Sequence, residues 1–146
     1  MRTTSSTLDL AVRLRLAITR TSRRLRQTSD RGLSPSLTSA LATVDSHGPL
    51  TPSELAARER VQRPTATRLV ARLEALGVLQ RAADPQDRRS SLLSVTPEGH
   101  ALIEELRSRK TAYLANRLEG LDPEEQATLD RAAAILERLL EEDDRA

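Results

Sequence analysis

Two helix-start signals lie close together in this chain, and their spacing limits how the residues between them can fold. The run TPSE at residues 51–54 has the pattern of a capping box, with a proline at the first helical position. Pro64 marks a second start only a few residues further on, so the first helix must be short. The spacing therefore predicts two helices joined by a tight turn around Arg60 and Val61.

The second of these helices has a clear apolar face. Its apolar residues recur at helical spacing and predict a helix over roughly 64–76: Leu69, Val70, Leu73 and Leu76. Gly77 stands where a helix of this length would end. Two short helices with this connection form a helix-turn-helix, whose second helix is the one that enters the major groove of DNA.

A β-hairpin is predicted directly after this unit. Two short extended runs, at residues 78–81 and 91–95, flank a polar turn that contains a proline. Further helices are predicted at 8–27, where apolar residues follow one helical face, and after Ser34-Pro35, ending at His47-Gly48-Pro49.

Two more helix starts follow the hairpin. Thr96-Pro97 begins a long helix over about 97–118, and Asp122-Pro123 begins a terminal helix with an apolar stripe. The apolar faces of the first and last helices lie outside the small central unit and need a partner, which a symmetric homodimer provides.

Composition excludes several classes of function. The chain has no Cys, which excludes disulfides, thiolate metal sites and cysteine-based redox sensing. His47 and His100 have no evident partners, so neither a metal, a cofactor nor an enzyme is expected. Tyr113 is the only aromatic residue, which argues against a platform that stacks single-stranded bases. No apolar run is long enough to cross a membrane and no signal segment is evident, so the expected location is the cytoplasm.

The net charge of +2 hides an asymmetry along the chain. Residues 1–89 carry 16 Arg and 8 acidic residues, whereas residues 90–146 carry 7 basic and 13 acidic residues. A basic part beside an acidic part suggests a surface that faces nucleic acid. The charge asymmetry alone is equally compatible with the alternative of a salt-bridged helical protein whose charged faces are simply solvated.

The run from Leu50 to Gly99 resembles the MarR family of winged helix-turn-helix transcription regulators. Three segments carry the resemblance: LTPSELAARERV (50–61), RPTATRLVARLEALGVLQR (63–81) and DPQDRRSSLLSVTPEGHAL (84–102). It implies a homodimer with interlocking terminal helices, and a fold that is mainly α with a small β-hairpin wing. We expect a single domain over 1–146, with the winged helix-turn-helix core at about 34–96 and dimerisation helices at about 8–27 and 97–142.

Two residues depart from the family pattern. Arg60 stands at the turn position where many relatives have Gly, and a positive φ is disfavoured for other residues, so a wider or shifted turn is expected. Glu59 stands where relatives often place an apolar residue.

Candidate DNA-binding residues follow from the motif. The start of the second helix would meet base edges with Arg63, Thr65, Thr67 and Arg68. The two arginines suit bidentate contacts to guanine, and the threonines suit a thymine methyl or a phosphate. Arg72, one turn beyond, is a phosphate candidate. The alternative for each is a solvated helix face.

In the hairpin turn, the resemblance implies that Asp87 steadies the wing and that Arg89 reaches the minor groove, with Arg88 as a helper. The alternative is an exposed salt bridge within the hairpin.

The resemblance also implies a ligand site. Relatives often bind small anionic aromatic compounds in a cleft between the dimer helices and the DNA-binding lobe; the candidates here are Arg13, Arg20, His47 and Tyr113. With so few aromatic side chains, the surfaces on which an aromatic ligand usually stacks are missing. The alternative that this family member binds no such ligand therefore stays open.

The resulting prediction is a dimeric, sequence-specific regulator of transcription, most often a repressor in such families. It would bind a pseudo-palindromic site in double-stranded DNA, with half-sites roughly 10 base pairs apart, and a small-molecule effector would release it. The alternatives are a low-specificity DNA-coating protein and a protein-interaction module with no DNA readout.

Overall fold

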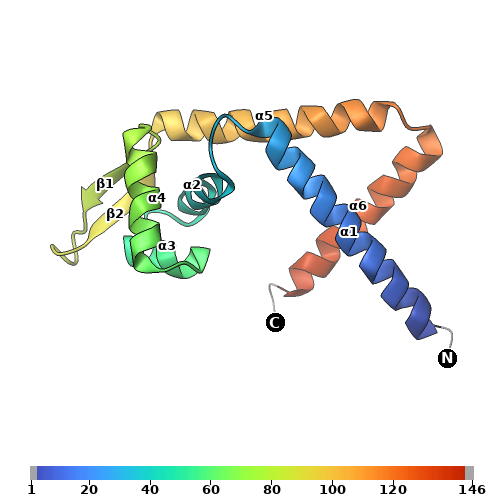
Figure 1. Cartoon of the computed structure of the whole chain (residues 1–146), viewed down its shortest axis with the longest axis horizontal. Coiled ribbons are helices and arrows are strands. Elements are labelled where there is room, and N and C mark those ends of the chain that lie inside the picture. The colour runs from blue at the N-terminus through green and yellow to red at the C-terminus, as the bar shows by residue number, and fades with distance from the viewer. Residues whose placement is uncertain (1–2, 144–146) are drawn as a thin grey trace. The chain divides into compact units, whose positions relative to one another are not determined.

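The computed structural model of the chain describes residues 3–143, with side chains described from residue 6. Over these residues it contains six helices and one antiparallel two-stranded sheet (Figure 1). In chain order they are α1 (Thr3–Ser29), α2 (Pro35–His47), α3 (Pro52–Glu59), α4 (Arg63–Ala75), β1 (Leu79–Ala83), β2 (Ser91–Val95), α5 (Pro97–Glu119) and α6 (Pro123–Asp143). The predicted mainly α fold with a β-hairpin is confirmed.

The chain divides into two compact units, Met1–Lys110 and Thr111–Ala146, and the division falls within α5. The first unit contains the helix-turn-helix and the hairpin, and the second contains the end of α5 and all of α6. No helix in the described part of the chain has both the length and the apolar character needed to cross a membrane.

Side-chain caps set the helix starts where the sequence predicts them. Ser34 accepts the amide of Leu37 at 3.3 Å at the start of α2. At α3, Thr51 and Glu54 form the complete capping box, with bonds of 3.2 and 2.9 Å. Asp122 and Glu125 form the same reciprocal pair at α6, with bonds of 2.8 and 3.2 Å. Each cap satisfies amides that the first helical turn leaves without a partner.

The turn between α3 and α4 is tight, so the expectation of a wider or shifted turn is wrong. Arg60 itself adopts the left-handed conformation, with φ 54° and ψ 43°. Its amide donates to Ala57 O at 3.2 Å, and the amide of Val61 donates to Ala56 O at 3.0 Å. These bonds satisfy the last carbonyls of α3 and help to offset the conformational cost at Arg60.

Glu59 replaces an apolar contact with a polar one. Its carboxylate is half-buried and accepts the hydroxyl of Ser39 at 2.7 Å and that of Thr43. Both hydroxyls come from α2, so Glu59 links the end of α3 to that helix.

The core of the first unit lies beneath the helix-turn-helix. Leu41, Leu55, Leu73 and Leu93 come from four different elements and have no exposed surface. Leu50 forms an isolated antiparallel bridge to Leu93, with bonds of 2.7 and 3.2 Å, beside the hairpin. The hairpin pairs Leu79 with Val95 and Ala83 with Ser91, so β1 begins and ends later than the predicted 78–81.

Thr96 joins the hairpin and the end of α4 to α5. Its hydroxyl donates to Gly77 O at 2.7 Å and accepts the amide of Gly99 at 3.0 Å, while its own amide donates to Val78 O at 3.1 Å. A Cβ atom at Gly99 would clash with the carbonyl oxygen of Val78. Thr96 and Gly99 are thus packing requirements at this junction.

The expectation that both histidines lack partners is wrong for His100. Its Nδ1 lies 2.8 Å from a carboxylate oxygen of Asp45 at the end of α2. Arg107 approaches the other oxygen of Asp45 at 3.5 Å, so two residues of α5 converge on one acid of α2.

The terminal helices leave large apolar side chains uncovered in a single chain. On α1 these are Leu8, Leu10, Val12, Leu14, Leu16 and Ile18. On α6 they are Leu129, Ile135, Leu139 and Leu140, and no described residue of α6 is buried.

Candidate nucleic-acid interface

One face of α4 is anchored in the core and the opposite face is open. Ala66, Val70 and Leu73 are buried. The predicted DNA-contacting residues Arg63, Thr67, Arg68 and Arg72 are exposed, whereas Thr65 is half-buried. Because anchoring one face of a helix fixes its rotation, all four exposed side chains project away from the core, Arg63 and Thr67 on one side of the helix and Arg68 and Arg72 on another.

The first turn of α4 has no side-chain cap. Gln62 occupies the N-cap position and makes no side-chain hydrogen bond there. Free amides and the positive end of the helix dipole favour an anion at such a terminus. Thr67 donates its hydroxyl to Arg63 O at 3.0 Å, so that hydrogen is used within the helix, and the methyl group is left for an apolar contact.

The arginines of this face are not neutralised by acidic side chains. Within residues 6–143 no carboxylate lies within salt-bridge distance of Arg63, Arg68, Arg72, Arg88 or Arg89. Other arginines of the first unit, Arg31 and Arg81 among them, do pair with glutamates. The alternative of a hairpin salt bridge at Arg88 or Arg89 therefore has no support in the geometry.

Two aspartates shape the loop between β1 and β2. Asp87 accepts the amide of Arg89 at 3.0 Å, and Asp84 accepts the amide of Gln86 at 2.9 Å. Backbone bonds from Ser90 to Asp87 at 3.0 Å and from Asp84 to Ser90 at 3.2 Å close the same loop. Local bonds of this kind fix turn geometry, so they hold the backbone that carries Arg89 in this turn.

A groove connects α4 with the base of the wing. Its volume is about 240 Å³ and its walls bring Arg63 and Thr67 of α4 together with Arg89. Arg68, Arg72, Arg88, Asp87 and Thr65 do not line it. The groove gathers two arginines that lack an acidic partner, Arg63 and Arg89, with several hydroxyls, a donor set that suits a phosphate oxygen.

Sequence reasoning missed part of this groove. Ser53 in the first turn of α3 and Arg81 on β1 also line it, with Ser90 and Ser91 beside them. Arg81 lies on the same strand face as buried Leu79, two residues earlier, and Glu74 holds its guanidinium at 2.7–2.8 Å. The period of two along β1 is the sequence signal that places Arg81 on the face toward α4.

The four predicted ligand-binding residues are spread over three helices. Arg13 and Arg20 are exposed on α1, and His47 is the exposed last residue of α2. Tyr113 belongs to the second unit, where the guanidinium of Arg117 lies 5.3 Å from its ring centre. Among the described residues, no cluster of His, Asp and Glu side chains is arranged to hold a metal ion.

Comparison with known proteins places this interface in a family. The profile of the MarR family matches residues 33–91. An uncharacterized helix-turn-helix-type transcriptional regulator of Mycobacterium bovis is 40% identical over 134 residues, which are 91% of this chain and 94% of that protein. The helix-turn-helix-type transcriptional repressor MdtR of Bacillus subtilis is 32% identical over 114 residues, 78% of this chain and 74% of the repressor.

A solved structure agrees over nearly the whole chain. The transcriptional regulator Tm0710 of Thermotoga maritima superposes with a TM-score of 0.82 at 28% identity, covering 95% of this chain and 99% of that one. The matched family and the matched proteins are transcriptional regulators rather than enzymes, and the matches extend well beyond the helix-turn-helix. The chain therefore belongs to the MarR family of DNA-binding, winged helix-turn-helix transcriptional regulators.

Proposed function

We propose that this regulator is a sequence-specific repressor that binds a pseudo-palindromic operator as a homodimer. The observation that carries the proposal is the groove in which Arg63 and Thr67 of α4 meet Arg89 of the wing. A helix that reads the major groove and a wing that follows the backbone into the minor groove would place a phosphate between them. The repressor MdtR among its relatives supports the direction of regulation.

In this proposal α4 supplies the base contacts. Arg68 and Arg63 form bidentate contacts with guanine, and the methyl of Thr67 contacts a thymine. Arg72 binds a phosphate one turn further along the exposed face. Half-buried Thr65 contributes at the edge of this surface.

The wing supplies the second contact. Asp87 holds the loop through the amide of Arg89, at 3.0 Å, so Arg89 enters a narrow minor groove from an ordered backbone. Arg88 binds an adjacent phosphate. Asp87 in this reading shapes the loop and does not contact DNA.

The uncovered apolar faces of α1 and α6 supply the dimer. Burying them against a second copy removes large side chains from water, Leu8 at 65% and Leu140 at 66% exposure among them. Two-fold symmetry then requires half-sites about one helical turn apart. The protein acts in the cytoplasm, and a small ligand that favours a different lobe spacing releases it. Arg13, Arg20, His47 and Tyr113 stay proposals for contacts to such a ligand.

Selection of random duplexes on the purified protein tests the proposal, followed by titration of the enriched sequence at two salt concentrations. The proposal predicts an enriched inverted repeat that is held well above bulk DNA at the higher salt. Binding without an enriched sequence, lost uniformly as salt rises, would instead identify a DNA-coating protein. No binding to any duplex would favour the remaining alternative, a protein-interaction module with no DNA readout.

A further inference from the structure

One side of α4 faces the wing, and an acidic residue lies at its far end. Arg63, Thr67, Val70 and Glu74 follow one another at intervals of three or four residues, which places them in a row along the helix. The first three line the groove described above. Glu74 does not line it but pairs with Arg81 of β1, which does. The row therefore leads from the first turn of α4 to an ion pair that joins this helix to the wing.

The pair has a defined geometry. A single oxygen of Glu74, Oε1, lies 2.8 Å from Nε and 2.7 Å from Nη2 of Arg81. The two side chains belong to α4 and β1, which pack against each other, and they are 32% and 40% exposed. Among residues 6–143, none accepts a hydrogen bond from Nη1 of Arg81. That nitrogen and its two hydrogens are left for a ligand in the groove.

Arg81 differs in this respect from the other two arginines of the groove. Arg63 and Arg89 have no carboxylate within salt-bridge distance in the described part of the chain. A free arginine side chain loses rotamer entropy when a ligand fixes it. The guanidinium of Arg81 is already held through two nitrogens, so it loses less of this entropy on binding.

Glu74 also has an unfavourable effect on any anion in the groove. Its carboxylate is a negative charge close to the space in which the proposed DNA phosphate lies, and like charges repel. By this effect alone, removal of the charge would strengthen binding to every duplex. The effect of Glu74 on the position of Arg81 has the opposite sign, so an experiment can separate the two.

We propose that Arg81 binds a phosphate of the DNA backbone and that Glu74 is the positioning residue that holds it for this contact. The inference rests on the proposed function, which places a phosphate between α4 and the wing. Nη1 of Arg81 donates to a phosphate oxygen that Arg63 or Arg89 also contacts, beside the hydroxyl of Ser53. Glu74 itself does not touch DNA.

A contact of this kind strengthens binding without reading sequence. Phosphates are present at every base pair, so the loss of Arg81 weakens binding to the operator and to a random duplex alike. It also removes one phosphate contact from the salt dependence of binding. Both properties distinguish Arg81 from a base-reading arginine, for which the proposed function names Arg68.

The test uses three variants of the full-length protein: Arg81→Gln, Glu74→Gln and the double variant. Fluorescence anisotropy measures the Kd for the selected operator and for a random duplex, each at several salt concentrations. Glu104→Gln is the matched control, because Glu104 also pairs with an arginine of the first unit, Arg107 at 3.0 Å, but does not line the groove. Urea denaturation measures the free energy of unfolding of every variant.

We expect Arg81→Gln to weaken binding to both duplexes by about threefold or more, and to lower the slope of log Kd against log salt concentration by about one. Glu74→Gln should weaken both by about twofold or more, although it removes a negative charge beside the DNA. The double variant should bind no more weakly than Arg81→Gln, because Glu74 acts through Arg81. Glu104→Gln should bind as the wild type does.

A purely structural role of the pair gives a different pattern. If the pair only joins α4 to β1, both single variants lose stability, while the salt slope of Arg81→Gln stays at the wild-type value. That unchanged slope would overturn the phosphate contact, and so would a loss confined to the operator, which would assign Arg81 to a base instead.

Two further results would overturn the role of Glu74. Binding by Glu74→Gln that equals or exceeds wild-type binding would make it a counter-ion only, and a further loss in the double variant would show that it acts independently of Arg81. Failure of the proposed function appears differently, as equal affinity of the wild type for operator and random duplex. The random-duplex titrations would then still test the pair, and only a wild type that binds no duplex would overturn both.

Discussion

At the scale of single residues, Arg60 carries a conformational cost that a glycine would avoid. Its φ of 54° is disfavoured for a side chain with a Cβ atom, by about 1–2 kcal/mol. Arg60→Gly removes that cost but makes the unfolded chain more flexible, so we expect a net gain of about 0.5–1 kcal/mol in the free energy of unfolding. Urea denaturation at fixed protein concentration measures it.

Arg58→Gly is the control for this substitution, because Arg58 lies within α3. We expect it to lower the free energy of unfolding by about 0.5–1 kcal/mol. If both variants destabilise the protein equally, the left-handed conformation at Arg60 is not the source of the cost.

Thr96 is the second residue whose side chain decides local geometry. Thr96→Val keeps the shape but removes the bonds to Gly77 O and from Gly99 N, of 2.7 and 3.0 Å. The exposed fraction of Thr96 is only 9%, so both partners lose a bond in a largely dry site. We expect the free energy of unfolding to fall by about 1–3 kcal/mol, and by clearly less in Thr96→Ser, which keeps the hydroxyl. Equal losses in the two variants would show that the methyl group, not the hydroxyl, matters.

At the scale of elements, the wing contains one residue that we propose contacts DNA, Arg89, and one that positions it, Asp87. If Arg89 enters the minor groove, Arg89→Ala weakens operator binding at least tenfold, or about 1.4 kcal/mol. Asp87→Ala removes only the bond to the amide of Arg89, so we expect a smaller loss. Fluorescence anisotropy with a labelled operator measures both, with Gln86→Ala in the same loop as the control. A larger loss in Asp87→Ala than in Arg89→Ala would reverse the two roles.

Sequence patterns predicted the elements well wherever a local interaction decides them. Ser34, Thr51 and Asp122 cap α2, α3 and α6 as predicted, because a cap and the amides it satisfies lie within one helical turn. The first helix is longer than predicted, beginning at Thr3 and ending at Ser29, since its polar ends show no apolar periodicity. The partners of Glu59 lie in α2, too far away in sequence for any local pattern to show.

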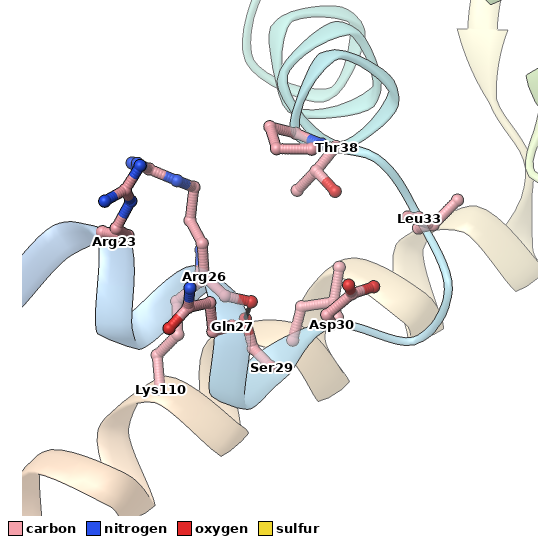
Figure 2. A pocket seen from close by; sticks show the side chains of 10 residues that line it. Arg23, Arg26, Gln27, Ser29, Asp30, Leu33, Thr38 and Lys110 are labelled. Atoms are coloured by element: carbon pink, nitrogen blue, oxygen red, sulfur yellow. Dashed lines mark hydrogen bonds between the residues drawn. The ribbon is translucent and has the colours of Figure 1, made fainter.

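The candidate site was predicted less completely than the fold, for the same reason. The arginines of α4 follow from helical spacing, since their apolar neighbours fix the buried face. Ser53 and Arg81 enter the groove only through the packing of α3 and β1 against α4. A separate pocket lined by Arg23, Arg26 and Lys110 (Figure 2) likewise depends on how α1, α2 and α5 meet.

At the scale of the whole molecule, the proposed dimer makes a prediction about α6. Leu139 is 51% exposed in the single chain. If a second copy covers this face, Leu139→Glu places a charge in an apolar interface, which costs several kcal/mol. We expect sedimentation to show a dimer for the wild-type protein and a monomer for the variant. Operator affinity should fall along with the dimer.

Leu76→Glu is the matched control for that experiment. Leu76 is 43% exposed but follows α4 in the first unit and belongs to neither terminal helix. It should leave the protein dimeric. A monomeric wild-type protein, or a Leu139→Glu variant that stays dimeric, would remove α6 from the proposed interface.

The central claim is that α4 reads base sequence, and Arg68 tests it most directly. The measurement is the ratio of operator affinity to random-duplex affinity for wild type, Arg68→Ala and Arg58→Ala, at two salt concentrations. We predict that Arg68→Ala lowers this ratio by about 1–3 kcal/mol, while Arg58→Ala, on the neighbouring helix, leaves it unchanged. An equal loss on both duplexes, with the ratio intact, would mean that Arg68 binds only phosphate and would contradict the claim.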